Sequence, residues 1–171
     1  MKKLFISMLM VCTFIGVYAG NPMKVTSGNG KFLKDAATAT VSFDWSQAQW
    51  NNEKPLTDQW GEEYQRLIAA GEKAFKDGFN ENSKKVKIAD ADAKYRIEIK
   101  ITNVDKYYSV MSLVPGHKHK VWGTVAVIDV LTNSAVCEAT FEELTGGRDF
   151  AIDDSFFKCM SDLGKAVSKI K

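Results

Sequence analysis

Residues 95–102 read Tyr-Arg-Ile-Glu-Ile-Lys-Ile-Thr, so apolar side chains alternate with charged or polar ones along the whole stretch. Successive side chains of a β-strand point to opposite faces of its sheet. The alternation therefore predicts a strand with one buried face and one face in water. Antiparallel sheets commonly leave one face in solvent. The stretch thus indicates a mostly antiparallel sheet whose charged face is open.

Other stretches add strands to this sheet. Residues 37–45 alternate in the same way, and residues 86–89 could form a short strand. Residues 121–131 are apolar on both faces, as expected of a central strand, and residues 135–144 alternate again. Between these two lies Thr-Asn-Ser at 132–134, which predicts a hairpin turn because Asn tolerates a positive φ. We therefore expect four to five strands.

Two stretches carry apolar residues at helical spacing. The first runs from a cap at Thr57 or Asp58 to about Asn80, after a polar loop over 47–55 that ends in proline. The second begins near Asp153, which can cap it, and continues towards the C-terminus. The expected fold class is therefore α+β, with two helices packed on one face of a mostly antiparallel, four- to five-stranded sheet.

The N-terminal residues have the features of a signal peptide. Two lysines precede an apolar run over 4–17, and small residues suitable for cleavage follow it. The run is shorter than the roughly 20 residues that span a bilayer. We expect residues 1–20 to be a cleaved signal peptide, residues 21–36 a flexible lead-in, and residues 37–171 a single α+β domain. The protein would then be periplasmic or secreted, with no transmembrane segment after cleavage.

The charge of the chain gives no electrostatic clue to a partner. There are 23 basic and 21 acidic residues, a formal net charge of +2. Two of the lysines belong to the expected signal peptide, so 23 − 2 = 21 basic residues face 21 acidic ones in the exported protein. A neutral domain offers no case for binding nucleic acid or an anionic membrane surface. We expect a monomer whose partner is an envelope protein.

Three pieces of the sequence carry a resemblance: Ala-Asp-Ala-Lys-Tyr-Arg-Ile-Glu-Ile at 91–99, the strand from Gly123 to Asp129, and Leu163-Gly164-Lys165 in the last helix. The chain resembles small secreted proteins of Gram-negative gut bacteria. Its strand–helix order is similar to that of envelope accessory domains such as the TolB N-terminal domain and the lipoprotein activators of peptidoglycan synthases. The resemblance implies a protein that binds partners and is not an enzyme.

Two cysteines remain once Cys12 leaves with the signal peptide. Cys137 and Cys159 both fall on positions expected to face the core, one on a strand and one on the last helix. In an oxidising compartment they could form a disulfide. The alternative is two buried free thiols that act as small hydrophobes.

His117 and His119 are the only histidines. Two residues apart on an extended segment they point to the same side, so they could hold a metal ion together with an acidic residue such as Asp105 or Asp129. The alternative is two solvated histidines next to lysines, whose charge disfavours a further cation. We expect no bound metal and no other cofactor.

The segment from Tyr107 to Val114 is unusually apolar for a connection between strands. It could be an exposed patch that docks a partner, or it could extend the preceding strand and be buried. The partner-binding surface expected from this segment and its neighbours consists of Tyr107, Tyr108, Met111, Leu113, His117, His119 and Arg148.

No catalytic triad, zinc signature or nucleotide-binding fingerprint stands out in the sequence. We therefore expect no enzyme activity but a non-catalytic, exported binding or accessory module of the cell envelope that acts through protein contacts. A small-molecule or lipid carrier is the first alternative, with a pocket lined by Trp45, Trp60 and Phe75. A metal-dependent hydrolase that uses His117 and His119 is the second.

Overall fold

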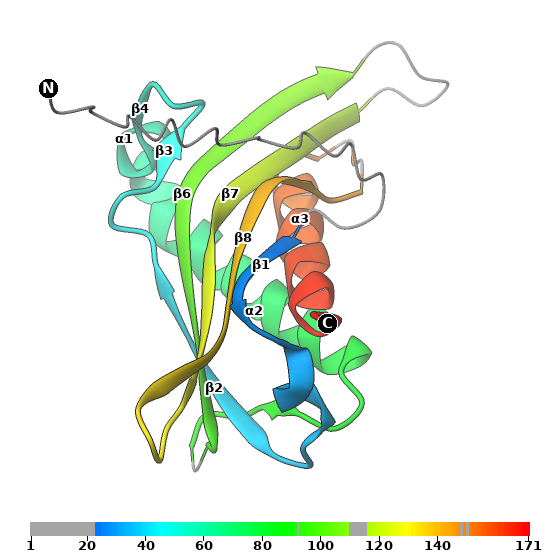
Figure 1. Ribbon diagram of the computed structural model, residues 1–171. Helices are drawn as coiled ribbons and strands as arrows, with labels where there is room; N and C mark the ends of the chain where they lie inside the picture. Colours follow the sequence, from blue (N-terminus) through cyan, green and yellow to red (C-terminus); the bar gives the residue numbers. More distant parts are fainter. Residues whose placement is uncertain (1–22, 92, 110–115, 148, 150) are drawn as a thin grey trace, which may run out of the picture.

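A curved sheet with helices on one of its faces forms the protein (Figure 1). The computed structural model describes residues 23–171 apart from residues 92, 110–115, 148 and 150. The elements follow one another as β1 (Met23–Gly28), the 3-10 helix η1 (Gly30–Lys34), β2 (Thr38–Asp44), β3 (Gln49–Trp50), β4 (Lys54–Pro55), α1 (Leu56–Trp60), the 3-10 helix η2 (Gly61–Glu63), α2 (Tyr64–Asn82), β5 (Lys87–Ile88), β6 (Tyr95–Ser109), β7 (Gly116–Asp129), β8 (Ser134–Thr145) and α3 (Ile152–Val167).

The expected α+β class is confirmed, but the expected sheet is wrong. The sheet has eight strands and is mixed, with the order β1-β8-β7-β6-β2-β5 and with β3 paired to β6 and to β4. The pairs β6–β7, β7–β8 and β8–β1 are antiparallel, whereas β3 runs parallel to β6. Strand β2 runs parallel to both β6 and β5.

The parallel pairing follows from the order of the elements. After β2 the chain passes through α2 before it returns as β6 beside β2. A helical crossover of this kind brings the chain back to the end at which the first strand began, so the two strands run in the same direction. The alternation in each strand predicts its two faces but carries no information on the direction of its neighbour.

The additional strands lie in stretches without strong alternation. Residues 21–36 were expected to be a loose lead-in, but from Met23 they form β1 and η1, and β1 pairs with β8. The expected loop over 47–55 contains the small hairpin of β3 and β4. Its turn has Asn51 and Asn52 at φ of 53° and 57°, which is the backbone of a type I′ turn and suits Asn.

Strand β6 contains a β-bulge at Thr102. Ile101 pairs with Gly123 and Asn103 pairs with Trp122, so Thr102 is an extra residue on its side of the ladder. A single extra residue exchanges the two faces of a strand and bends it. Before the bulge the odd-numbered residues of β6 face the helices, and after it the even-numbered ones do.

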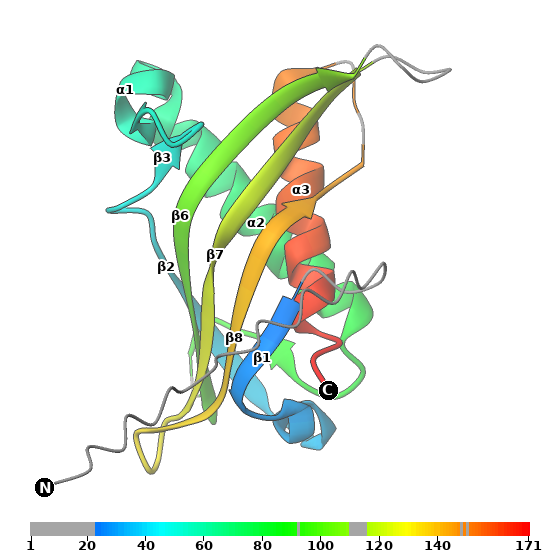
Figure 2. The ribbon, with the colours of Figure 1, turned by 45° about the horizontal axis from the view of Figure 1, so that its top comes forward.

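Strand β8 is irregular at the same level. Glu142 and Glu143 together lie opposite Trp122, and Glu143 has a φ of 50°. The ladders on both sides of Trp122 are therefore interrupted, and β6 and β7 bend strongly along their length (Figures 1 and 2).

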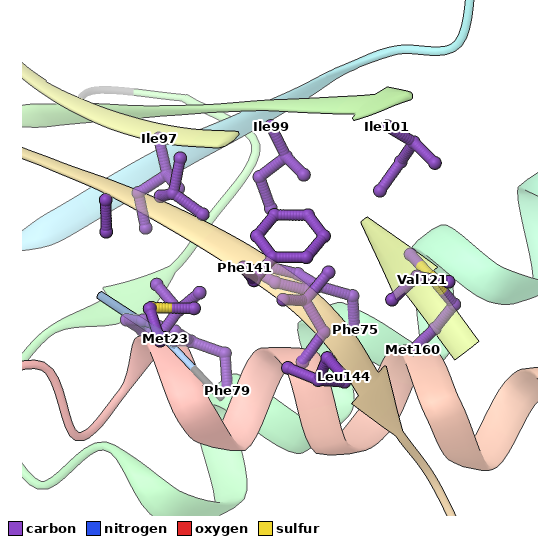
Figure 3. Packing of buried hydrophobic residues seen from close by; sticks show 14 of the residues in the cluster. Met23, Phe75, Phe79, Ile97, Ile99, Ile101, Val121, Phe141, Leu144 and Met160 are labelled. Carbon is purple, nitrogen blue, oxygen red and sulfur yellow. The ribbon is translucent and has the colours of Figure 1, made fainter. Parts of the chain in front are cut away.

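The helices α2 and α3 pack side by side on one face of the sheet (Figures 1 and 2), and the sheet's inner side chains point towards them (Figure 3). At their crossing the backbones come very close. A Cβ atom on Gly164 of α3 would lie 2.2 Å from the carbonyl oxygen of Phe75, and one on Gly78 of α2 would lie 2.2 Å from the carbonyl oxygen of Ser161. The helices can approach to this distance only because neither residue has a side chain.

The helix ends differ in detail from expectation. The first expected helix consists of α1 and α2 with η2 between them. Helix α3 begins at Ile152 after Ala151, without a side-chain cap, so Asp153 is not its N-cap. The Asp153 carboxylate instead accepts a hydrogen bond from Arg66 of α2 at 2.7 Å. No helix in the described part of the chain is both long and apolar enough to cross a membrane.

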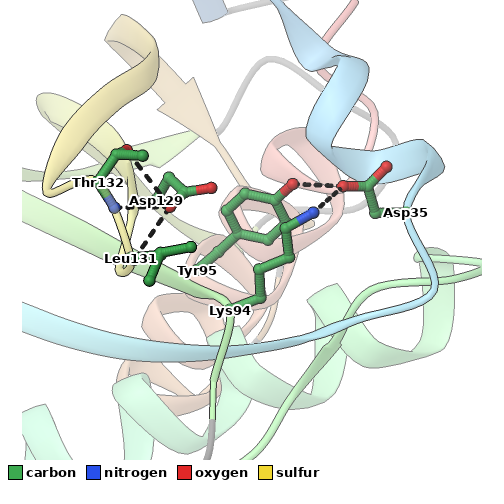
Figure 4. A network of polar contacts seen from close by, with 6 residues as sticks. All are labelled: Asp35, Lys94, Tyr95, Asp129, Leu131 and Thr132. Atoms are coloured by element: carbon green, nitrogen blue, oxygen red, sulfur yellow. Dashed lines mark hydrogen bonds and ion pairs between the residues drawn. The ribbon is translucent and has the colours of Figure 1, made fainter.

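Two sets of polar contacts fix the end of the sheet at which β2 and β6 begin and β7 turns into β8 (Figure 4). The carboxylate of Asp35 accepts hydrogen bonds from the Lys94 ammonium at 2.7 Å and from the Tyr95 hydroxyl. The carboxylate of Asp129 accepts hydrogen bonds from the backbone N–H groups of Leu131 and Thr132, at 3.0 and 3.1 Å. The second set closes the turn between β7 and β8 in the manner of an Asx turn.

The close crossing of the helices gives a test of the fold. We expect Gly164→Ala to lower the free energy of unfolding by about 1–3 kcal/mol, because the two helix backbones must move apart to admit the methyl group. Urea unfolding measures this change. Gly147→Ala is the control, since its new Cβ would lie at an ordinary 3.5 Å from the Lys158 side chain, and we expect a change within about 0.5 kcal/mol. Equal stability of the two variants would contradict the packing described.

Candidate functional site

Strands β6 and β7 continue beyond the rest of the sheet as a two-stranded arm (Figure 1). We define the arm as Lys106–Ser109 and Gly116–His119, which pair with each other in register. The pairing of β8 with β7 ends at Lys120, and the pairing of β3 with β6 ends at Val104. An isolated bridge from Asp149 to His117 is a further contact of the arm. The expected partner-binding residues Tyr107, Tyr108, His117 and His119 all lie here.

The two tyrosines of the arm point to opposite faces. Tyr108 is 52% exposed, and its ring centroid lies 5.0 Å from that of the cross-strand neighbour His117. Tyr107 is half-buried on the other face, where the Lys120 ammonium lies 5.3 Å from its ring centroid and also pairs with Glu143 at 2.7 Å. A cation over an aromatic face stabilises this arrangement. The described part of the expected segment, residues 107–109, thus continues the preceding strand and still exposes one aromatic ring.

His119 does not belong to an accessible surface. Its side chain is 1% exposed and packs between the rings of Trp50 and Phe156, at centroid distances of 5.9 and 5.7 Å. We expected it to contact a partner, but the alternation of β7 places it with Val121, Val125 and Val127 on the face that the helices cover. Burial, with smaller effects from Lys106 and His117, lowers the pKa of His119 from 6.5 to about 4.

His119 and Ser155 form a buried pair. The Nδ1 atom of His119 lies 2.7 Å from the Oγ atom of Ser155, and this Oγ also lies 2.7 Å from the carbonyl oxygen of Ile152. The hydroxyl has one proton, and the carbonyl can only accept. Both contacts are hydrogen bonds if Ser155 donates to the carbonyl and the Nδ1–H of His119 donates to Ser155. A general base would have to accept the serine proton, so this arrangement has the opposite polarity.

The two histidines lie on the same face of β7, as the spacing predicts. His117 is half-buried, and its Nδ1 atom is buried without a hydrogen-bond partner in the part of the chain that the structure describes. Lys106 lies directly across from His119. Within the described ranges no group of three or more His, Cys, Asp or Glu side chains is placed to hold a metal ion.

Cys137 and Cys159 are both buried free thiols in the structure. Burial raises the pKa of Cys159 to about 12, and its Sγ–H donates to the carbonyl oxygen of Leu144 at 3.2 Å. Burial also raises the pKa of Cys137. The geometry is that of small hydrophobes in the core, the second of the two arrangements that the sequence left open.

The space proposed for a carrier pocket is filled by aromatic side chains. Trp60 and Trp45 pack against Phe156, at ring-centroid distances of 5.0 and 6.4 Å, and Phe75 packs against Phe43 at 5.3 Å. Trp45 also donates a hydrogen bond from its indole nitrogen to Glu72 at 2.9 Å. Trp45 and Phe75 are therefore core residues, and Trp60 is partly buried against the core.

Three of the expected contact residues, Met111, Leu113 and Arg148, lie outside the described residues.

The sequence did not predict a hollow of about 400 Å³ on the open face of the sheet beside the bulge of β6. Its lining comes from the β2–β3 connection, β3, the β3–β4 turn, β6 and β7, so no local pattern marks it. The pair Asn51-Asn52 is the only local signal, since it predicts a tight turn.

No family model matches the chain, and no curated protein matches it either. The PelC dodecamer from Paraburkholderia phytofirmans is similar at 15% identity over 84% of this chain and 96% of that one, with a TM-score of 0.46. A DUF330 protein from Xanthomonas campestris is similar at 15% identity over 78% and 82%, with a TM-score of 0.41. At these identities the likeness concerns the fold alone. Neither structure is a TolB domain or a lipoprotein activator. The resemblance of the sequence to those envelope accessory domains therefore stays a prediction.

The buried imidazole predicts how stability depends on pH. The unfolded chain takes up a proton near pH 6.5, whereas folded His119 takes one up only near pH 4. The unfolded state therefore binds more protons between these values, and folding stability falls as the pH falls through this window, by about 3 kcal/mol in total. Urea unfolding at pH 7 and pH 4 measures the loss.

His119→Gln can keep a hydrogen bond to Ser155 and cannot take up the proton, so we expect it to lose about 3 kcal/mol less than the wild type over this range. His117→Gln is the control and should retain the wild-type loss. The assignment fails if His119 titrates near pH 6.5 in an NMR experiment, or if His119→Gln shows the wild-type pH dependence.

Thiol labelling tests the burial of the cysteines. At pH 8 we expect a maleimide to react with the native protein at least about a hundredfold more slowly than with the protein in urea, because the thiolate is scarce and inaccessible. Mass spectrometry counts the labels. Fast labelling of the native protein would show that the core opens near Cys137 or Cys159.

Proposed function

We propose that this chain is a non-catalytic binding module of the cell envelope that holds a protein partner at its arm. The observation that carries the proposal is the open edge of β6 next to the exposed ring of Tyr108. No described strand pairs with this edge beyond Val104. An unpaired edge offers backbone donors and acceptors to another chain, and an aromatic side chain beside it supplies apolar contact area.

The backbone bonds around β3 show which groups of the arm point outward. The N–H of Asn51 donates to the carbonyl oxygen of Val104 at 3.0 Å, as part of the pairing of β3 with β6. The backbone groups of Val104 therefore point away from β7. Because this direction repeats every second residue, the N–H and C=O of Tyr108 point outward as well. An extended segment of a partner could add to the sheet there as a further strand.

The titratable core groups support binding rather than catalysis. The pair of His119 and Ser155 is buried, and its hydrogen bonds have the wrong polarity for a nucleophile and its base. The thiol of Cys159 is buried, and its raised pKa keeps it protonated. The aromatic packing around Trp60 also gives no support to a carrier. Export to the envelope rests on the expected signal peptide.

A substitution at the open edge tests the proposal. Tyr108→Pro removes both the outward N–H and the exposed ring, while proline is tolerated on an edge strand. We expect the tagged mature protein to recover its partners from an envelope extract at least about tenfold less well with this variant. Mass spectrometry of the captured proteins measures recovery, and hydrogen exchange of the complex should show protection at Tyr108.

Leu131→Ser is the matched control, since Leu131 is 93% exposed in the β7–β8 turn, at the other end of the sheet from the arm. This variant should capture the same proteins as the wild type. Equal capture by Tyr108→Pro, or no capture by any form, would contradict binding at the arm. A large drop in the melting temperature of Tyr108→Pro would show instead that the residue belongs to the core.

A further inference from the structure

The hollow on the open face of the sheet has the side chains of a binding site. It holds about 400 Å³ and lies where β3 pairs with β6 beside the bulge. The residues that matter for its chemistry are four amides, one cation and one indole, namely Gln47, Gln49, Asn52, Asn103, Lys100 and Trp122. The helices cover the other face of the sheet, so this face is open to a ligand.

The bulge brings the indole and a buried amide together. Asn103 pairs across the ladder with Trp122, and the extra residue Thr102 precedes it on the same face. Trp122 is half-buried, between two interrupted ladders, and its side chain contributes to the wall of the hollow. Bulges commonly re-aim side chains in this way.

Asn103 provides an independent sign of a ligand. Its side chain is 3% exposed and lines the hollow, and its Oδ1 atom accepts a hydrogen bond from the backbone N–H of Asn52 at 2.8 Å. Its Nδ2 atom is buried and has no partner among the described residues. Leaving a buried amide donor unsatisfied is unfavourable, and folded proteins normally satisfy such groups with water or a ligand.

The chemistry of the lining selects a class of ligand. Carboxamides present a donor and an acceptor side by side, which suits adjacent hydroxyl groups. The face of an indole packs well against the flat apolar face of a sugar ring. Lys100 is the one charged residue of the described lining; its cross-strand neighbour Asp44 lies beside the hollow but does not line it, so the Lys100 ammonium would favour a single carboxylate. A single cation is too little charge to bind a phosphate-rich ligand. Four amides do not favour a lipid chain, because hydrocarbon cannot satisfy their hydrogen bonds.

We propose that this hollow binds an acidic carbohydrate, with a sugar ring stacked on Trp122, hydroxyl groups bonded to the amides of Gln47, Gln49 and Asn103, and a carboxylate at Lys100. The site lies on the outer face of the sheet, whereas the proposed protein contact uses the strand edge at Tyr108. The carbohydrate site therefore does not rest on the proposed protein partner.

NMR titration of the mature protein tests the site. The probes are oligogalacturonate, oligomannuronate and hyaluronan oligosaccharides, with methyl-esterified oligogalacturonate and cellotetraose as uncharged counterparts. We expect at least one acidic probe to shift the side-chain resonances of Asn103 and Trp122, and its uncharged counterpart to bind at least about tenfold more weakly. No shift with any probe, or shifts confined to other residues, would overturn the proposal.

Two variants and a control complete the test. Trp122→Ala should weaken binding of the acidic probe at least about tenfold, and Lys100→Gln should abolish the preference for the acidic over the esterified form. Lys24→Gln is the control for charge. Lys24 lies on the same face, in the cross-strand row that continues through Thr140 and Thr124 to Lys100.

The control variant should bind like the wild type. Urea unfolding of each variant shows whether it is folded. If Trp122→Ala is unfolded, Lys100→Gln decides alone. Retained preference in a folded Lys100→Gln variant, or equal loss in Lys24→Gln, would overturn the carboxylate contact.

Discussion

The extra residue Thr102 determines which side chains of β6 face the helices at each end of the strand. Before it, Ile97, Ile99 and Ile101 point into the core, and after it the even-numbered residues take their place. The matching irregularity of β8 at Glu143 lets all three strands bend at the level of Trp122. The placement of Tyr108 opposite His117 and the hollow beside Asn103 follow from this local exchange of faces, whereas the burial of His119 follows from the unbroken alternation of β7.

The packing of the helices on the sheet determines the protonation state of the titratable groups in the interior. Gly164 and Gly78 allow α2 and α3 to approach until their backbones are nearly in contact, and the rings of Trp45, Trp60 and Phe156 fill the space beside them. A core packed in this way leaves its titratable groups without water, so imidazole and thiol both stay neutral. The space between the helices and the sheet is filled. The two candidate sites therefore lie on the surface, at the strand edge of the arm and on the open face of the sheet.

Part of the architecture could be predicted because local patterns report on burial. The alternation over 95–101, the turn at 132–134 and the two apolar stripes correctly indicated strands, a hairpin and helices. The mixed sheet could not be predicted in this way, because strand direction depends on the crossover between β2 and β6. Strand β1 was missed because its outer residues Lys24, Thr26 and Ser27 are polar edge residues, and only pairing with β8 makes them a strand.

Some features of the candidate sites could likewise be predicted from the sequence, and others could not. The sequence by itself determined the α+β class, the two cysteines that face the core and the aromatic stretch beside the histidines, since residue type and period suffice for these. Only the tertiary structure decided that His119 is buried, that Tyr108 lies on an open edge, and that Asn103, Lys100 and Trp122 line one hollow. A bulge shifts side chains by one residue without leaving a periodic signal, and long-range pairing joins segments that no local pattern connects.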